Sequence, residues 1–497
     1  MEAEYVEQAG NELRQHCETA SRDSHASMKC VRALGPESKN FCELSRTYLK
    51  QVGESRAPRQ VTPHFAPIPA LHACWKGGAS KSQIERGTGI VREGSRGNIA
   101  QDIERMEYLD GVRGWAALVV VLHHLALTFE PLWLKTGEVA PSLGPLSFLV
   151  DGGLAVCIFF ILSGIVLAAA TDGALRRLSG PTFVGLIAKR WLRLMLPILA
   201  VAVVAWVMLR ANFNLAPMAA IFTGSTWAMG FYPRWYDPTL PRVLWEAAYG
   251  AFAGAETPFH NPVLWTIRVE FPGSVLTFAI CLLARSSRAR LVLAALAALA
   301  LLQMPFWILN DCALFPVGVA MWEVLKRRET IPWGRTADLC GLALVALGLV
   351  ILPVLDHFFS TAALRRDMTT VADDVGLMNL NPWAVRAMLI IVGVCLSPTA
   401  MGFLGNSLSR FLGRISFAVY LSHSLILVSL GAFTYVMLLH PLGRIGSMAA
   451  ATFGVLTASI ALGWGLHRWV ERPAILIAGR AGALVDRMWR RLSVGDG

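Results

Sequence analysis

The sequence is poor in charged side chains: Asp, Glu, Lys and Arg together make up only 16% of its 497 residues. Soluble domains carry roughly a quarter of charged residues, so this deficit argues against a water-soluble fold. Hydrophobic residues make up 55% and gather in unbroken runs such as 291–302 and 341–352. A bilayer accepts such runs because a helix satisfies its own backbone hydrogen bonds. The composition therefore predicts an all-α bundle of membrane-spanning helices.

Other features that the sequence lacks exclude further classes of protein. The first 105 residues contain no sustained apolar run, so we expect no secretory signal there. The nine cysteines show no pair spacing typical of a metal site. The net charge of +11 is spread between apolar runs and is not interleaved with aromatic residues on one face. We therefore expect no bound metal and no nucleic-acid partner.

The pattern of apolar runs divides the chain into three parts. Residues 1–105 are expected to form a loosely ordered, hydrophilic cytosolic extension, 106–475 a membrane domain, and 476–497 a basic cytosolic tail. A weaker apolar stretch, Leu215–Phe231, is rich in Gly, Ser and Thr. About ten spans are predicted: Val112–Phe129, Leu149–Ala170, Trp191–Leu209, Leu264–Ala284, Leu291–Leu309, Asp311–Leu325, Ala337–Leu355, Ala384–Leu404, Phe411–Leu439 and Gly446–Trp469.

Positive charge in the short loops predicts the orientation of these spans. With the N-terminus inside, the loops that return to that side carry most of the arginines and lysines, including Arg176, Lys189, Arg290 and Arg414. If Leu215–Phe231 crossed the membrane, the positively charged loops would no longer all lie on the inner side. We therefore expect that stretch to be re-entrant or packed against the bundle, and both termini to be cytosolic. The sequence does not indicate an organelle.

Ionisable residues inside spans are costly to insert and are therefore functional candidates. Arg113 and His124 lie eleven residues apart in the first span, so they fall within about 20° of one helix face and about 16 Å apart along its axis. His123 points about 80° away from Arg113 and is expected to pack against a neighbouring helix. The alternative is an interfacial arginine and a core histidine bonded to a backbone carbonyl.

Glu270 is the second candidate inside a span. In the ten-span topology it lies about 9 Å below the outer boundary, and His124 about 8 Å below the same boundary. A carboxylate beside a histidine fixes its tautomer and stabilises its protonated form, as a general base requires. The alternative is that Glu270 only neutralises Arg268 or another arginine.

Two further arginines, Arg190 and Arg193, lie one helical turn apart at the inner end of the third span. Together with Arg113 they place three guanidinium groups at one membrane level, which suits a polyphosphate that enters from the cytosol. The alternative is an ordinary cluster of cytosolic positive charge.

Five motifs in order resemble the membrane acyltransferase 3 family over residues 106–475. The run after Glu270, Phe271-Pro272-Gly273-Ser274, is similar to the fungal branch of this family, whose members include tailoring enzymes for secondary metabolites. The motifs are Leu109–His124, Phe159–Gly164, Arg190–Arg193 with Pro197, Trp265–Glu270, and Ile415–Phe417 through Tyr420–His423.

The resemblance implies an enzyme that moves an acyl group, usually acetyl, from acyl-CoA to a hydroxyl of a small molecule such as a secondary metabolite. His124 would act as general base or acyl carrier with Glu270 orienting it, and Arg113, Arg190 and Arg193 would bind the phosphates of CoA. Acyl-CoA is then a donor substrate, and no cofactor is bound permanently; the expected partners are the lipid bilayer, the donor and the hydroxylated acceptor. Two alternatives are O-acetylation of a cell-surface or lipid-linked sugar and, in another class, proton-coupled transport. Further site candidates are Ser163, Ser416, Tyr420 and His423.

Overall fold

The computed structural model describes residues 106–135, 138–139, 141–175, 182–229, 238–254, 260–304, 306–326, 334–358 and 381–494. The predicted N-terminal extension lies outside the described residues, so its loose order and cytosolic placement stay predictions. The described chain is almost entirely helical, which confirms the all-α fold class. Its one sheet pairs two short antiparallel strands, β1 (Leu134–Lys135) and β2 (Glu138–Val139).

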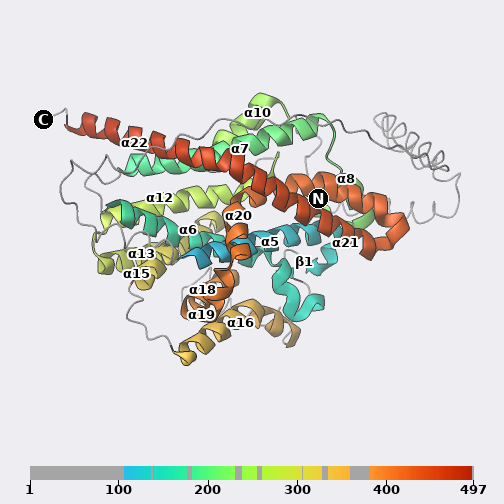
Figure 1. The fold of residues 1–497 in the computed structure, drawn as a ribbon, viewed down its shortest axis with the longest axis horizontal. Helices are drawn as coiled ribbons and strands as arrows, with labels where there is room; N and C mark the ends of the chain where they lie inside the picture. The colour runs from blue at the N-terminus through green and yellow to red at the C-terminus, as the bar shows by residue number, and fades with distance from the viewer. Residues whose placement is uncertain are drawn as a thin grey trace, which may run out of the picture. The chain divides into compact units, whose positions relative to one another are not determined.

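The long helices form a bundle in which segments far apart in sequence lie side by side (Figure 1). They are α5 (Glu107–Phe129), α6 (Gly152–Leu175), α7 (Phe183–Arg210), α12 (Ile267–Leu283), α13 (Ser287–Leu302), α15 (Leu314–Leu325), α16 (Arg335–Phe358), α18 (Pro382–Leu396), α20 (Ser407–Ile426), α21 (Ala432–Leu466) and α22 (Arg472–Val494).

Short helical segments connect or extend these long helices. They are η1 (Pro131–Trp133), η2 (Pro141–Val150), α8 (Ala216–Thr223), α9 (Thr226–Met229), α10 (Leu240–Trp245), η3 (Glu246–Gly250), α11 (Ala251–Ala253), η4 (Pro262–Thr266), α14 (Trp307–Cys312), α19 (Pro398–Leu404), η6 (Leu427–Gly431) and η7 (His467–Glu471).

Six helical stretches among the described residues are long and apolar enough to cross a membrane, or seven if the bent pair α18 and α19 forms one span. This supports a multi-pass protein but does not confirm about ten spans. The count differs partly because α13 has only 16 residues. In addition, the two last predicted spans belong to one continuous stretch, Ser407–Leu492. Residues 476–494, predicted as a basic tail, form most of α22 and pack along α7.

The weak stretch Leu215–Phe231 contains two short helices, α8 and α9. They have 8 and 4 residues, so the longer one rises only about 12 Å and neither crosses a bilayer. Their start is fixed by a 2.8 Å hydrogen bond from the Leu215 amide to the Val428 carbonyl. The structure therefore agrees with the prediction that this segment packs against the bundle.

Glycines allow α5 and α20 to touch through their backbones. A β-carbon at Gly114 would clash with the backbone of Gly413, and one at Gly413 would clash with the carbonyl oxygen of Asp110. Small residues at such crossings permit the closest helix packing in a membrane. This contact fixes the register between the two helices that carry the candidate histidines.

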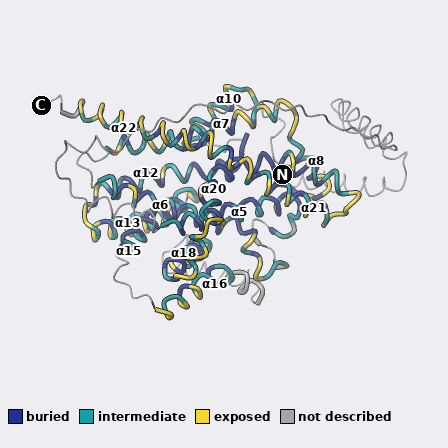
Figure 2. The backbone as a smooth tube through the Cα atoms, in the orientation of Figure 1, coloured by how far each residue is buried: buried dark blue, intermediate teal, exposed yellow. Residues whose placement is uncertain are grey.

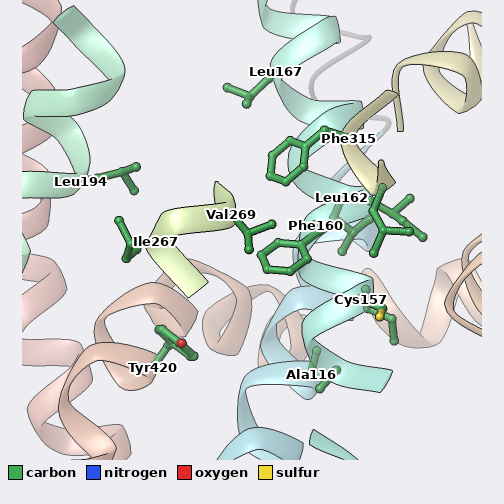
Figure 3. Packing of buried hydrophobic residues seen from close by; sticks show 14 of the residues in the cluster. Ala116, Cys157, Phe160, Leu162, Leu167, Leu194, Ile267, Val269, Phe315 and Tyr420 are labelled. Carbon is green, nitrogen blue, oxygen red and sulfur yellow. The ribbon is translucent and has the colours of Figure 1, made fainter. Parts of the chain in front are cut away.

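Buried residues concentrate where α5, α6, α12 and α20 meet (Figure 2). Phe160 of α6 and Phe315 of α15 lie with ring centres 5.7 Å apart (Figure 3). Figure 3 also shows Ile267 of α12 between Leu194 of α7 and Tyr420 of α20. These residues belong to one hydrophobic core, which forms the walls of the site described next.

A closed cluster of charge lies at the ends of α6, α13 and α15. Arg290 forms ion pairs with Asp172 and, at 3.2 Å, with Glu323. Lys326 contacts the same two carboxylates at 3.3 and 2.5 Å. The Trp322 indole donates to Asp172 at 2.9 Å. We call these five residues the charge clamp, because they join three helices through balanced charges.

Candidate active site

A cavity of about 970 Å³, counting its open mouth, lies between α5, α6, α7, α12 and α20. Seven of the nine predicted site residues line it, although they come from five different helices. Aromatic side chains such as Phe159 and Phe417 form much of the remaining wall. The seven are Arg113, Ser163, Arg190, Arg193, Glu270, Ser416 and Tyr420.

Local structure explains why α7 presents two arginines to the cavity. Thr182 caps the helix, since its hydroxyl accepts a 3.1 Å hydrogen bond from the Gly185 amide. Asp486 of α22 in turn accepts bonds from the Thr182 amide and hydroxyl. Arg190 and Arg193 then lie three residues apart on the same face. The N-terminal half of α7 is thereby held against α22 with both guanidinium groups turned inward.

Glu270 pairs with Arg190 and not with His124. The Arg190 guanidinium donates to the Glu270 carboxylate, which also accepts from the Ser163 hydroxyl at 2.8 Å. Arg190 further donates to the Ser274 hydroxyl at 3.1 Å. The predicted pairing of Glu270 with His124 is wrong. The prediction took the depth of each residue from its distance in sequence to the end of its span, which assumes that all spans start at one level and run parallel. Instead, the first turn of α12 lies alongside Arg190.

The other two arginines have weaker partners or none. Arg113 contacts Asp110 at 3.3 Å, but both side chains are partly exposed, and such pairs contribute little. Arg193 makes no hydrogen bond or ion pair with any described residue. The second carboxylate of the lining is Glu471 of η7. Three guanidinium groups therefore face two carboxylates, and the cavity keeps an excess of positive charge suited to an anion.

The two candidate histidines contact each other outside this cavity. His423 Nε2 lies 3.0 Å from His124 Nδ1, which also lies 3.0 Å from the Val120 carbonyl. The ring of His124 lies 5.0 Å from that of Trp227 in α9. His123 lies 2.8 Å from the Val150 carbonyl, so it packs on a neighbouring segment as predicted.

Tyr420 connects the cavity to the histidine pair. It lines the cavity, its ring centre lies 5.9 Å from that of His423, and its hydroxyl lies 2.7 Å from that of Thr266. Ser416 donates to the Gly413 carbonyl at 2.8 Å, which is the intrahelical bond expected of a serine in a helix. The arginine cavity and the histidines are thus adjacent regions joined by α20.

Sequence reasoning missed Glu471 and Trp227. Glu471 follows His467 by four residues, and the two side chains meet at 2.8 Å on η7. That spacing was a usable signal, but the charges there were interpreted only as part of a basic end. Trp227 gave no signal, because its contact with His124 depends on how α9 folds back. Among the described residues no group of His, Cys, Asp and Glu is arranged to hold a metal ion.

Comparisons with known proteins identify the family and three related sequences. A family model described as "Acyltransferase domain" matches residues 106–464. The O-acetyltransferase PaAT-1 of Phomopsis amygdali is 28% identical over 400 residues, covering 68% of this chain and 73% of that protein.

Two further fungal proteins are similar at lower identity. Acyltransferase R4 of a Phoma species is 24% identical over 461 residues, covering 78% of this chain and 96% of that protein. Acyltransferase clz18 of Cochliobolus lunatus is 23% identical over 463 residues with the same coverage, 78% and 96%. No solved structure matches the chain.

Proposed function

The chain belongs to the acyltransferase 3 family, and on this premise we propose that it moves an acetyl group from acetyl-CoA to a hydroxyl of a small molecule. Similarity to a fungal protein named as an O-acetyltransferase supports the choice of acetyl and of an oxygen acceptor. The run Phe271–Ser274, which is similar to the fungal branch with its tailoring enzymes, supports a small secondary metabolite over a cell-surface sugar.

The convergence of three arginines in one cavity is the observation that carries this proposal. Guanidinium groups bind phosphates with paired, charge-assisted hydrogen bonds. Among the described residues Arg193 makes no hydrogen bond or ion pair, and Arg113 makes one ion pair, with Asp110. Glu270 holds Arg190 in place and so positions it for the same ligand. Acetyl-CoA is the acyl donor that carries such a group of phosphates.

In the proposed reaction His124 takes the proton from the acceptor hydroxyl. The hydroxyl oxygen then attacks the thioester carbonyl, the carbon–sulfur bond breaks, and the proton passes from His124 to the departing CoA sulfur. The pantetheine arm is of the same order as the spacing of about 16 Å from Arg113 to His124. Because His124 does not line the cavity, the proposal requires the wall at Phe159 and Tyr420 to move when the donor binds.

The test is acetyl transfer from radiolabelled acetyl-CoA by the full chain in nanodiscs, with extracted metabolites as acceptors. We expect His124→Ala and His124→Gln to lose transfer while still binding CoA. His440→Ala, on an exposed histidine of α21, is the matched control and should keep full activity. Undiminished transfer by either His124 variant would eliminate the assignment.

The acceptor class has its own test in cells. We expect deletion of the gene to replace one metabolite by a species lighter by one acetyl unit. Loss of acetyl groups from surface polysaccharide instead would favour the sugar alternative.

The histidine pair inside the bundle also suits a proton-coupled transporter, which is the rival from another class. Such a protein would show pH-dependent uptake and no thermal shift with CoA. We expect the reverse, a CoA-dependent thermal shift that needs more CoA in Arg193→Ala than in the wild type.

A further inference from the structure

His423 is fully buried on α20, one helical turn beyond Tyr420, and its only side-chain hydrogen-bond partner among the described residues is His124. The surrounding contacts hold this turn of α20 in place. Asn261 donates to the Leu421 carbonyl at 2.9 Å and accepts from the Ser424 hydroxyl at 2.9 Å. The ring of His423 is thus fixed on a rigid support, as a residue that orients another must be.

The backbone around His423 determines which of its nitrogens carries the proton. Nδ1 lies 2.7 Å from the Tyr420 carbonyl and 3.3 Å from the Val419 carbonyl. A carbonyl oxygen only accepts, so Nδ1 must be the donor. In the neutral ring Nε2 therefore holds the lone pair.

The same argument applies to His124. Its Nδ1 faces two acceptors, the Val120 carbonyl and the lone pair on His423 Nε2, each at 3.0 Å. Nδ1 therefore carries the proton, and the lone pair of His124 lies on Nε2. No described residue makes a hydrogen bond to that Nε2.

We propose that His423 is a positioning residue that, together with the Val120 carbonyl, holds the ring orientation and the tautomer of His124, so that Nε2 is always the basic atom. This rests on the proposed function, in which His124 is the base, and it gives a role to His423, which the sequence offered only as a further site candidate. A histidine pair with a single direction of hydrogen bonding does the orienting work that a carboxylate does in other acyl-transfer sites.

The pair also determines the fate of the proton taken from the acceptor. No carboxylate lies within hydrogen-bonding distance of either ring among the described residues. A proton taken up by His124 Nε2 is therefore not stabilised by a counter-charge. It leaves to the CoA sulfur as the carbon–sulfur bond breaks, so that the base is restored in each cycle.

The test compares His423→Phe with His423→Gln in the full chain in nanodiscs. Phenylalanine keeps the ring but removes both nitrogens, whereas glutamine can donate to the Tyr420 carbonyl and accept from His124 Nδ1. We expect His423→Phe to lower kcat about 10²- to 10³-fold, with KM for acetyl-CoA within about twofold, by analogy with loss of the orienting group of a catalytic triad. We expect His423→Gln to recover at least about a tenth of wild-type kcat.

The controls separate failure of this inference from failure of the proposed function. His440→Phe, at an exposed histidine, should have wild-type kinetics. Wild-type kcat in His423→Phe, or equal loss in the Phe and Gln variants with CoA binding intact, overturns the positioning role alone. Full activity in His124→Gln overturns the proposed mechanism itself. If His423→Phe does not fold, His423→Leu takes its place in the same comparison with His423→Gln.

Discussion

The charge clamp and the arginine cavity both place arginines beside carboxylates inside the bundle, yet their charges are arranged differently. In the clamp two cations face two carboxylates, and each makes at least one ion pair. Arg290 and Glu323 are almost completely buried there, at 5% and 0% exposure. In the cavity three cations face two carboxylates, and Arg193 makes no hydrogen bond or ion pair with any described residue.

This difference separates a structural cluster from a binding site. A buried ion must be paired, because the desolvation cost of a lone charge is several kcal/mol. The clamp meets this condition with its own side chains, so it needs no ligand. The cavity leaves one cation for an anion from outside, and its mouth is open. Charge balance therefore distinguishes a cluster that is complete in itself from the cavity that we propose as the CoA site.

Removing a cation from the clamp should have the largest effect on stability. Arg290→Ala leaves Asp172 and Glu323 with only Lys326, and breaking a buried pair in this way costs about 3–5 kcal/mol. We expect a marked fall in the unfolding temperature in detergent, with the transfer rate per folded molecule unchanged. Arg288→Ala, at an exposed arginine on the same helix, is the control. An unfolding temperature equal to that of the control would mean that the clamp does not hold the helices together.

Removing a cation from the cavity should weaken CoA binding and leave the stability of the fold unchanged or slightly higher. Arg193→Ala takes away a guanidinium that repels Arg190 and Arg113, so we expect stability to stay equal or rise slightly. CoA binding should weaken by about 1.5–3 kcal/mol, the worth of hydrogen bonds to a charged group. Isothermal titration with CoA measures the loss, and Arg210→Ala at the far, exposed end of α7 is the control. Unchanged affinity in Arg193→Ala would remove the distinction between the two clusters.

The sequence predicted which arginines line the cavity better than it predicted which side chains they and Glu270 contact. Arg113, Arg190 and Arg193 were grouped correctly because positive charge at one end of several spans is visible from order and spacing alone. The partner of Glu270 was assigned wrongly because helix tilt and the 3₁₀ segment η4 change its depth, and neither is visible in the spacing.

Arg290 shows that sequence patterns are equally limited in predicting contacts within the fold. It was counted as a loop charge, because its position just before an apolar run is typical of a cytosolic loop. The structure buries it between α6, α13 and α15, since the carboxylates of Asp172 and Glu323 come from spans remote in sequence. The contact of His124 with His423 was likewise hidden, because it joins residues 299 positions apart. Sequence patterns therefore predicted which residues are unusual, while tertiary packing decides what each one contacts.

The smallest expected effect concerns Glu471, whose carboxylate lines the cavity beside His467. In the clamp every carboxylate stabilises a cation, but in the cavity this one also opposes an incoming phosphate. Glu471→Gln removes that repulsion and keeps the side-chain shape, so CoA should bind about two- to fivefold more tightly, since a single charge in the wall of an open cavity contributes about 1 kcal/mol. The gain should shrink at high salt, because the open cavity is screened. Weaker binding in Glu471→Gln would show instead that this carboxylate holds Arg193 in place, and the cavity would then resemble the clamp.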